Sequence, residues 1–425
     1  MKSLFLKIVI VLVVFFLVGK SAVSAGPDWV GWRGESRDGT VAGREWPRDL
    51  GEGKLVRKWR VTLAEGYPGP IVSGDKVFTV ETQNKENEVV RAFHRDTGKQ
   101  LWERGWSGSM KVPFFAARNG SWVRSTPATD GRLLFVGGMR EVLVALDVET
   151  GEVRWRFDFG AKLKSDLPSF GFVCSPLVDE GSVYVQAGGG ICKLDAVSGD
   201  LLWHTPGEGG GMSGGAFSSP ILASISGSKQ LIVQGRDELK GLSPQSGSVL
   251  WHQPVKAFRG MNIVTPVPYG DSFFTTTYGG RSILWGIEKA EGGYGVEQSW
   301  VNKLQGYMCT PVVVDDHAYF HLKSQRAACV DLRSGEIKWV SDQRFGKYWS
   351  LVSQGDRLLA LDERGDLILF KANPGAFEMI DRRKVSEEET WGHLTVVDGE
   401  IYIRELNGLS AWRWNGETQL SLHKQ

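Results

Sequence analysis

The chain has 425 residues, in which 50 Lys and Arg nearly balance 49 Asp and Glu, and it contains Gly 54, Trp 17 and only Cys 4. So few cysteines argue against a disulfide scaffold, and the balanced charge gives no electrostatic reason to expect nucleic acid or an anionic membrane as partner. Abundant glycine and tryptophan indicate many turns and recurrent aromatic packing.

Residues 1–25 have the pattern of a secretory signal peptide. Lys2 and Lys7 accompany a short apolar run at 8–19, and Val23-Ser24-Ala25 offers a small-residue cleavage site. The apolar run is too short to favour a membrane span. We therefore expect an exported protein, periplasmic or extracellular and soluble after cleavage, whose mature chain has a net charge near −2.

The next residues, 26–53, are expected to form an N-terminal capping segment. DWVGWRGESRDG (28–39) is rich in Trp, Gly and Arg and shows no clear periodicity. Trp29 and Trp32 would anchor this segment on the body of the protein. Strand-like alternation begins with KLVRKWRV at 54–61, so we assign the remainder, 54–425, to a single repeat domain.

That domain is organised by a repeat of 40 to 50 residues. ALDVETGEVRW at 145–155 recurs as KLDAVSGDLLW (193–203), GLSPQSGSVLW (241–251) and CVDLRSGEIKW (329–339). A Ser/Thr-Pro pair provides a second ruler of the same period, at 126–127, 175–176, 219–220, 265–266 and 310–311. Two markers of different chemistry with one period argue against coincidence.

Each part of the repeat has a local physical reason. Pro lacks a backbone donor and suits the first residue of a strand, Gly permits the positive φ of a tight turn, and Trp buries a large area against a neighbouring unit. A four-stranded antiparallel unit repeated radially is a blade of a β-propeller. We predict that one tryptophan in each fourth strand locks a blade to its neighbour: Trp59, Trp102, Trp155, Trp203, Trp251, Trp300 and Trp339.

Counting fourth strands predicts eight blades, two of which have lost parts of the repeat. Other repeats have a Thr/Ser-Gly turn whose glycine lies four residues before the tryptophan, as at Thr150-Gly151 before Trp155, whereas the fifth has AEGGYGVEQ before Trp300. The seventh has Met379 or Ile380 in place of the tryptophan. Both keep the alternation and turn signals of a blade.

The last segment, 391–414, supplies only three strands. We predict that 54–61 completes this blade as its outermost strand, so that the two ends of the chain close the ring and remove exposed sheet edges. A competing candidate for that strand is 417–422, because Asn415-Gly416 before it is a strong hairpin signal.

The LDxxTGxxxW frame, with the Ser/Thr-Pro strand and the Asp-Gly turn before it, resembles the pyrroloquinoline-quinone-type (PQQ-like) propeller repeat. This repeat is shared by the quinoprotein alcohol dehydrogenases and by the non-enzymatic propeller lipoprotein of the outer-membrane β-barrel assembly machinery. The resemblance covers roughly 54–414 and supports the propeller fold. It does not choose a function, because the same ring serves enzymes and scaffolds.

The resemblance also implies which residues a dehydrogenase of this type would need. Such enzymes carry an adjacent pair of cysteines beside the quinone, a carboxylate and an amide around a calcium ion, and an Asp as base. Here Cys174, Cys192, Cys309 and Cys329 are all separated, and no position matches the calcium ligands or the base. We therefore predict no cofactor, no metal site and no catalytic residue, with PQQ and calcium kept as the alternative.

Other candidate sites are expected to be structural. The four cysteines occupy equivalent places in two blades, beyond disulfide reach, and suit small buried positions. His317 and His321 share one face of a predicted strand, but no further metal ligand can be named. GEGGGMSGG (207–215) lacks the ending of a phosphate loop, so we expect a flexible connection.

The connections that lead from a fourth strand to the next first strand carry the most information about function. In a propeller they gather on one face around the mouth of the channel, and here several are long and rich in aromatic and basic residues. Aromatic residues and Arg are enriched at protein-binding hot spots, and loops on a rigid scaffold often carry recognition. The candidate binding face comprises Lys111, Phe114, Phe115, Arg118, Trp122, Arg124, Phe170, Arg259, Arg344, Lys347, Tyr348, Trp349 and Trp391.

These features predict a monomeric, non-enzymatic scaffold that binds a protein or peptide partner in the cell envelope through the loop-bearing face. A PQQ-dependent enzyme that oxidises sugars or alcohols and a carbohydrate-binding propeller are the alternatives. A purely structural role also stays open, in which the aromatic residues plug the channel and pair with the arginines locally.

Overall fold

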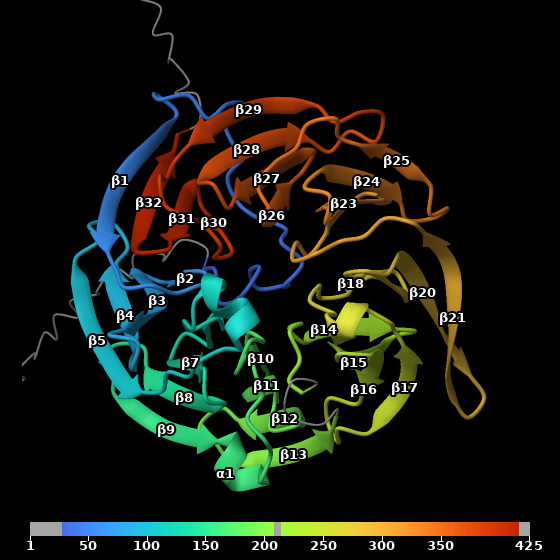
Figure 1. Ribbon diagram of the computed structural model, residues 1–425, viewed down its shortest axis with the longest axis horizontal. Helices are drawn as coiled ribbons and strands as arrows, with labels where there is room; N and C mark the ends of the chain where they lie inside the picture. Colours follow the sequence, from blue (N-terminus) through green and yellow to red (C-terminus); the bar gives the residue numbers. More distant parts are fainter. Residues whose placement is uncertain (1–27, 208–213, 416–425) are drawn as a thin grey trace, which may run out of the picture.

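The computed structural model describes residues 28–207 and 214–415, which form a ring of eight antiparallel four-stranded sheets around a central channel (Figure 1). The predicted all-β, eight-bladed propeller is therefore confirmed. The predicted signal peptide at 1–25 and the competing outer strand at 417–422 lie outside the described residues. Within the described part, no helix is long and apolar enough to cross a membrane.

In each blade the first strand is innermost and the fourth strand is outermost. Blade 1 consists of β2 (Ile71–Ser73), β3 (Lys76–Gln83), β4 (Asn87–His94) and β5 (Gln100–Ser107). Blade 2 consists of β6 (Ala128–Thr129), β7 (Leu133–Gly138), β8 (Val142–Asp147) and β9 (Val153–Asp158). Blade 3 consists of β10 (Leu177–Asp179), β11 (Ser182–Ala187), β12 (Gly190–Asp195) and β13 (Leu201–Pro206). Blade 4 consists of β14 (Ile221–Ile225), β15 (Ser228–Gln234), β16 (Glu238–Leu242) and β17 (Val249–Pro254).

The second half of the ring repeats this order. Blade 5 consists of β18 (Val267–Tyr269), β19 (Ser272–Thr276), β20 (Ser282–Ala290) and β21 (Gly293–Asn302). Blade 6 consists of β22 (Val312–Val314), β23 (His317–His321), β24 (Ala327–Asp331) and β25 (Ile337–Val340). Blade 7 consists of β26 (Trp349–Gln354), β27 (Arg357–Asp362), β28 (Asp366–Lys371) and β29 (Met379–Lys384). The short helices are η1 (Phe114–Asn119), α1 (Phe159–Leu163) and η3 (Phe258–Gly260).

Blade 8 joins the two ends of the chain. It consists of β30 (Thr395–Val397), β31 (Glu400–Glu405), β32 (Gly408–Trp414) and, as its outer strand, β1 (Leu55–Thr62). β1 pairs antiparallel with β32, from Leu55 opposite Trp414 to Thr62 opposite Gly408. The predicted closure of the ring by 54–61 is confirmed, because the N-terminal strand completes the four-stranded sheet of the last blade.

The fourth-strand tryptophans reach from one blade into the next. The indole N–H of Trp155 donates to the carbonyl oxygen of Ala196 at 2.9 Å, in the turn between the third and fourth strands of the next blade. A β-bulge beside Trp155 turns the indole toward that turn. Equivalent bonds join Trp59 to Arg95, Trp102 to Val148, Trp203 to Pro244, Trp300 to Leu332 and Trp339 to Asn373.

The repeated glycine belongs to the same contact. Gly199 has φ of +76°, and a Cβ built there would lie 2.6 Å from the ring of Trp155. Glycine therefore serves the turn and also leaves room for the indole of the preceding blade. This explains why the Thr/Ser-Gly turn and the tryptophan recur together.

Trp251 is the exception among these tryptophans. Its indole N–H donates to Oε1 of Gln230 at 2.8 Å, within its own blade 4. The next blade has lost the Thr/Ser-Gly turn, and a long hairpin formed by β20 and β21 stands in its place. Without that turn the neighbouring blade offers no carbonyl in the usual position, so the indole bonds locally.

The N-terminal segment enters the channel. Asp28 accepts hydrogen bonds from Ser73 and Gly74, at the turn between β2 and β3, and Val41 donates to the carbonyl of Ser353 near the end of β26. Between these points the chain crosses the middle of the ring, where it is drawn in dark blue in Figure 1. The segment therefore fills the channel from the face that bears the hairpin turns between first and second strands.

Candidate functional site

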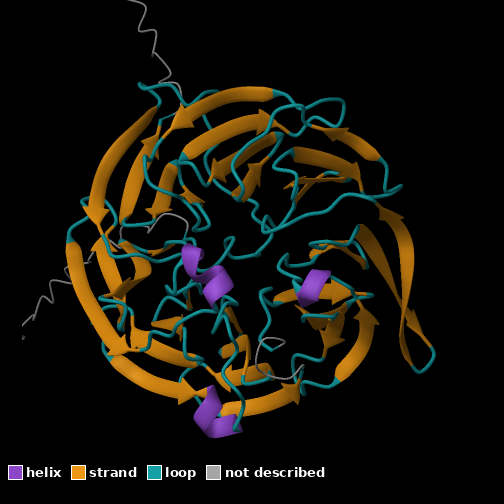
Figure 2. Cartoon of the chain, in the orientation of Figure 1, coloured by secondary structure: helices purple, strands orange, loops and turns teal. Residues whose placement is uncertain are grey.

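The opposite face carries the eight connections from fourth strands to first strands. Each connection ends at an innermost strand, so all of them converge on the mouth of the channel. Figure 2 shows two of the short helices, η1 and η3, at the edge of the central opening and α1 at the outside of the ring. We call this surface the connection face.

Aromatic side chains from successive connections form a continuous arc on this face. Tyr67 lies 5.4 Å from Trp122 and stacks on Trp391 at 4.8 Å, between ring centroids. Trp391 in turn lies 4.2 Å from Tyr348, which is 5.5 Å from Tyr307. These contacts link the connections of five blades, because each residue comes from a different connection.

The arc continues through blade 5. Tyr307 lies 4.8 Å from Tyr278, which lies 5.8 Å from Phe258 in η3. Tyr278 belongs to the turn between the second and third strands, which opens on the same face. We call the seven residues from Trp122 to Phe258 the long arc.

A shorter arc covers the other side of the mouth. Phe115 lies 5.7 Å from Phe114 and 6.3 Å from Phe170, and Phe170 lies 5.5 Å from Phe217. The guanidinium of Arg236 lies 4.8 Å from the centre of the Phe217 ring. Together the two arcs take at least one aromatic residue from every connection.

The predicted binding residues divide by exposure. Phe114 and Phe115 stand out, 91% and 52% exposed. Exposed with them are Lys111, Arg259, Arg344 and Lys347, while Trp122, Arg124, Phe170 and Trp391 are half-buried. Arg118 belongs to η1. The connection face thus combines a half-buried aromatic floor with a few aromatic and basic side chains that project from it.

Tyr348 and Trp349 are not part of the exposed surface. Trp349 begins β26 and is 4% exposed, and its indole N–H donates to Asp362 at 3.1 Å. It packs on His321 and Phe345, inside blades 6 and 7. Tyr348 is buried but forms part of the long arc through its ring. The seventh blade lacks the Ser/Thr-Pro marker, and its inner strand begins with the tryptophan instead.

Five members of the arcs were not predicted from the sequence: Tyr67, Phe217, Phe258, Tyr278 and Tyr307. Three of them, Tyr67, Phe217 and Tyr307, lie in connections only two or three residues before the proline-containing start of an inner strand. That recurrent position is the signal that could have found them. Tyr278 lies in a different kind of turn, for which the repeat gives no marker.

Three tyrosines of the long arc, Tyr67, Tyr307 and Tyr348, keep neutral hydroxyl groups at physiological pH. Burial raises the pKa of Tyr348 to about 12, and burial also raises the pKa of Tyr67 and of Tyr307 above the ordinary value. Arg124 stands over the ring of Tyr67 at 5.4 Å and donates to the carbonyl oxygen of Gly120. Arg124 therefore behaves as expected for a purely structural role, because it contacts an aromatic ring and a backbone carbonyl of its own surroundings.

The centre of the channel is occupied by two arginines of the N-terminal segment. Arg33 donates to the carbonyl oxygens of Thr310 and Pro311, both at 2.7 Å, and Arg37 donates to those of Pro176 and Ser175. Both guanidinium groups are buried, and burial lowers the pKa of Arg33 to about 10 and of Arg37 to about 9. Both guanidinium groups contact Trp32: Cζ of Arg33 lies 5.6 Å and Cζ of Arg37 lies 5.4 Å from the centre of the indole ring.

These residues do not fit a quinone of the dehydrogenase type. The carbonyls that begin the inner strands of blades 3 and 6 are engaged by Arg37 and Arg33. Cys174 and Cys309 directly precede these strands but belong to different blades, so they cannot form the adjacent pair that the resemblance describes. All four cysteines are free and buried. Among the described residues, no group of three or more His, Cys, Asp and Glu is placed to hold a metal ion.

The predicted histidine pair does not act as a unit. His321 is buried, and burial lowers its pKa to about 3, so the ring stays neutral and stacks on Trp349 at 4.9 Å. His317 lies at the other end of β23, 3.8 Å from a carboxylate oxygen of Asp331. The glycine-rich stretch predicted as a flexible connection includes 208–213, which lie outside the described residues.

A family model described as outer membrane protein assembly factor BamB matches residues 85–341, more than half of the chain. The chain belongs to this family. BamB of Yersinia pestis is 22% identical over 83% of this chain and 78% of the relative. BamB of Shewanella oneidensis is 22% identical over 85% of this chain and 86% of the relative. A polyvinylalcohol dehydrogenase of Sphingopyxis is 28% identical, over 43% of this chain and 28% of that enzyme.

Solved structures show the same fold. The crystal structure of BamB from Moraxella catarrhalis has a TM-score of 0.63 at 16% identity, covering 86% of this chain and 99% of that one. A europium-containing methanol dehydrogenase has a TM-score of 0.51 at 13% identity, covering 90% and 89%. The BamB family membership and the likeness to a methanol dehydrogenase confirm the PQQ-like repeat, and the BamB relatives support a propeller scaffold.

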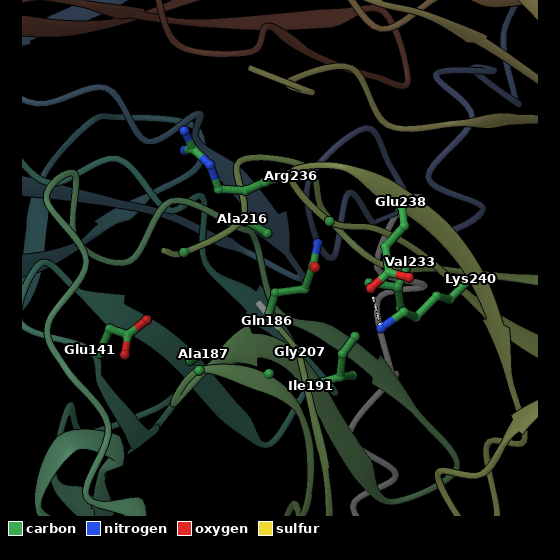
Figure 3. A pocket seen from close by; sticks show the side chains of 14 residues that line it. Glu141, Gln186, Ala187, Ile191, Gly207, Ala216, Val233, Arg236, Glu238 and Lys240 are labelled. Carbon is green, nitrogen blue, oxygen red and sulfur yellow. Dashed lines mark ion pairs between the residues drawn. The ribbon is translucent and has the colours of Figure 1, made fainter. Parts of the chain in front are cut away.

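One cavity of this BamB-family propeller lies between blades 3 and 4. Figure 3 shows the side chains around it, among them Gln186, Arg236 and the ion pair of Glu238 with Lys240. Its volume of about 40 Å³ suits a few water molecules, whereas ligand pockets are several times larger. Its lining includes Gly207 and Gly215, which flank the residues that the structure does not describe, so we assign no ligand to it.

A larger cavity, of about 290 Å³, lies between blades 1 and 2 and is lined by two buried carboxyl groups. Glu88 accepts hydrogen bonds from the backbone N–H of Met139 at 2.6 Å and from the indole N–H of Trp106 at 2.9 Å. Glu141 accepts from the backbone N–H of Gly188 at 3.1 Å. Each glutamate stands at the start of a third strand and binds a turn of the next blade, so both are links between blades.

The buried glutamates predict a pH-dependent stability. Burial raises the pKa of Glu88 and of Glu141 to about 7, so the folded protein holds protons that the unfolded chain releases near the ordinary value. Their contribution is therefore complete below the ordinary glutamate pKa and is lost as pH rises through about 7. Glu141→Gln should raise the free energy of unfolding at pH 8 by about 1–2 kcal/mol over the wild type and have little effect at pH 5.

Chemical denaturation across this pH range tests the prediction. The amide of Glu141→Gln keeps an acceptor for Gly188 but has no proton to lose. Glu35→Gln, at an exposed position of the N-terminal segment, is the matched control and should leave the profile unchanged. Parallel profiles for Glu141→Gln and the wild type would contradict the assignment.

Proposed function

We propose that this chain is an exported, non-enzymatic propeller scaffold that binds a protein or peptide partner in the cell envelope through its connection face. The observation that carries the proposal is the pair Phe114 and Phe115, 91% and 52% exposed beside the half-buried aromatic arcs. Large phenyl side chains left in water at the mouth of a rigid ring are costly unless another surface covers them.

The setting of these phenyl groups favours recognition. η1 holds them on a connection between blades 1 and 2, and the backbone of both flanking strands is fixed by sheet pairing. Loops held by a rigid scaffold lose little freedom on binding, which is typical of binding sites. Arg259 adds an exposed guanidinium on the far side of the mouth, and aromatic residues with Arg are the common anchors of protein interfaces.

The relatives give the proposal its setting. Several are named outer membrane protein assembly factors, which supports a role in the cell envelope and in a protein assembly. We propose likewise that the chain works without a quinone or calcium, because Arg33 and Arg37 fill the channel. A monomeric propeller exported by a signal peptide at 1–25 completes the proposal.

Affinity capture from an envelope extract tests the binding face. Phe114→Ala combined with Phe115→Ala should abolish capture of the proteins that the wild type retains, identified by mass spectrometry. Leu101→Ala combined with Val153→Ala is the matched control, because these residues are 41% and 47% exposed but lie on outer strands β5 and β9. Equal capture by both double variants would overturn the proposal for this face.

A further inference from the structure

The aromatic floor of the connection face is not uniform in charge. Within the long arc, four rings of blades 4 to 7 follow one another: Phe258, Tyr278, Tyr307 and Tyr348. Basic side chains stand over these rings from three successive blades. We call these four rings and the cations over them the basic arc.

The cations of the basic arc are held by aromatic rings instead of carboxylates. Nζ of Lys323 lies 4.5 Å from the centre of the Tyr278 ring, and Nζ of Lys347 lies 4.9 Å from that of Tyr348. The guanidinium of Arg259 lies 5.2 Å from the centre of the Phe258 ring. All three side chains are exposed, so the cation–π contact orients each cation while its hydrogen-bond donors stay in water.

The opposite face, which bears the hairpin turns between first and second strands, differs because its cations form ion pairs. There Lys58, Lys76 and Arg95 are joined to carboxylates at or near blade junctions. Among the described side chains, no ion pair includes Lys323, Lys347 or Arg259. The three cations of the basic arc therefore have no carboxylate at ion-pair distance within the described part of the chain.

Acidic residues on the same face set the limits of the basic arc. Asp342 and Glu363 lie beside it, and Glu363 accepts from the backbone N–H of Lys347. Beyond Tyr348, the connection between blades 7 and 8 carries Glu387, Glu388 and Glu389. An anionic ligand is attracted by the basic arc and repelled at this acidic end, which gives the surface a direction.

We propose that the partner binds through an acidic segment of polypeptide that lies on the basic arc, its carboxylates on Lys323, Lys347 and Arg259 and its apolar side chains on the rings between them. This inference rests on the proposed function and names the chemistry of the partner. A polypeptide suits the site better than nucleic acid, because the cations are few, each is fixed on its own ring, and the mature chain is close to neutral overall.

Fluorescence anisotropy with synthetic probes tests the inference. The probe is a short labelled peptide in which Asp and Glu alternate with Phe and Leu, compared with a peptide in which Lys replaces the acids and with a single-stranded oligonucleotide of equal charge. We expect the acidic peptide to bind best, with an affinity that falls as salt rises. Lys323→Ala combined with Lys347→Ala should weaken it about tenfold.

Lys99→Ala combined with Lys289→Ala is the matched control, because it removes the same charge from exposed sites away from the connection face, in the β4–β5 turn and near the end of β20. It should leave the affinity for the acidic peptide unchanged. Equal binding of the basic peptide, tighter binding of the oligonucleotide, or no loss in the Lys323 and Lys347 variant would overturn the inference. If the acidic peptide fails to bind while the Phe114 and Phe115 variant still loses its envelope partner, this inference falls and the proposed function stands.

Discussion

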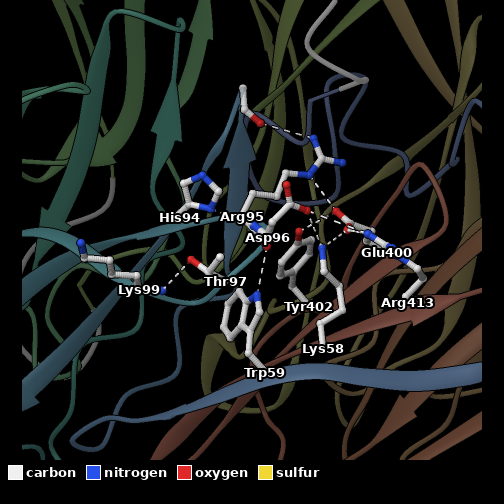
Figure 4. A network of polar contacts seen from close by, with 11 residues as sticks. Lys58, Trp59, His94, Arg95, Asp96, Thr97, Lys99, Glu400, Tyr402 and Arg413 are labelled. Carbon is white, nitrogen blue, oxygen red and sulfur yellow. Dashed lines mark hydrogen bonds and ion pairs between the residues drawn. The ribbon is translucent and has the colours of Figure 1, made fainter. Parts of the chain in front are cut away.

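Replacing Glu400 by Gln should lower the free energy of unfolding by about 3–5 kcal/mol, because this carboxylate joins both ends of the chain to the first blade. Glu400 in β31 pairs with Lys58 of β1 and with Arg95, at 2.7 Å, in the β4–β5 turn of blade 1. The hydroxyl of Tyr402 donates to it at 2.7 Å. Figure 4 shows these groups converging at the junction. Replacing the carboxylate of Glu400 takes one ionic partner from each of two mostly buried cations, Lys58 and Arg95.

Equilibrium denaturation measures the effect, and pH gives a second readout. Burial alone would raise the pKa of Glu400, but the hydrogen bonds from Lys58, Arg95 and Tyr402 outweigh it and lower the pKa. The stabilisation is therefore present above the ordinary glutamate pKa and is lost as pH falls through the lowered one. Glu336→Gln, in an exposed pair with Lys338, is the control and should change stability by less than about 0.5 kcal/mol. A similarly small effect for Glu400→Gln would mean that strand pairing alone closes the ring.

Replacing Arg33 by Gln should destabilise the protein by about 3 kcal/mol. The guanidinium satisfies the buried carbonyls of Thr310 and Pro311 and bonds the carbonyl of Arg37 within its own segment. A shorter amide cannot reach all of them, so buried acceptors lose their donors. Loss of these bonds should also loosen the segment around Trp32.

Arg48→Gln is the control for this variant, because Arg48 is exposed in the same segment. Denaturation gives the stability, and limited proteolysis between residues 28 and 50 reports whether the segment leaves the channel. A buried guanidinium is itself costly to desolvate, so a neutral or stabilising Arg33→Gln would show that the desolvation cost outweighs the hydrogen bonds.

The repeat made most of the fold predictable. The tryptophan and the Ser/Thr-Pro pair each mark a fixed place in a blade, and their common period gave the number of blades and the closure by 54–61. These features are local in the sequence and identical from blade to blade. Trp251 departs from the pattern because the bond it lacks depends on the next blade, whose turn has been replaced.

The candidate site was only partly predictable, because its contacts join connections that are far apart in the sequence. The long loops were correctly expected at one face. Tyr67 and Tyr307, however, come from short connections, and only their stacking on Trp391 and Tyr348 in the structure identifies them as members of the arc. Trp349 has the same composition signal as its neighbours but starts an inner strand and is buried. The threading of Arg33 and Arg37 into the channel left no periodic signal at all.

The filled channel leaves the connection face as the place proposed for recognition. A ring of this kind offers two places for a ligand, the centre and the connection face, and here Arg33 and Arg37 occupy the first. The connection face keeps exposed Phe114, Phe115 and Arg259. Recognition is therefore expected at the surface of the ring, where side chains outside the repeat are gathered.

Site-specific photo-crosslinking in the cell that makes the protein tests this claim most directly. A photoreactive phenylalanine analogue is placed at Phe115 on the connection face and, separately, at Leu101 on outer strand β5, both exposed positions. We predict a discrete crosslinked product with an envelope protein from position 115 and none from position 101. Crosslinking from position 101 alone, or equally from both positions, would contradict a binding site on the connection face.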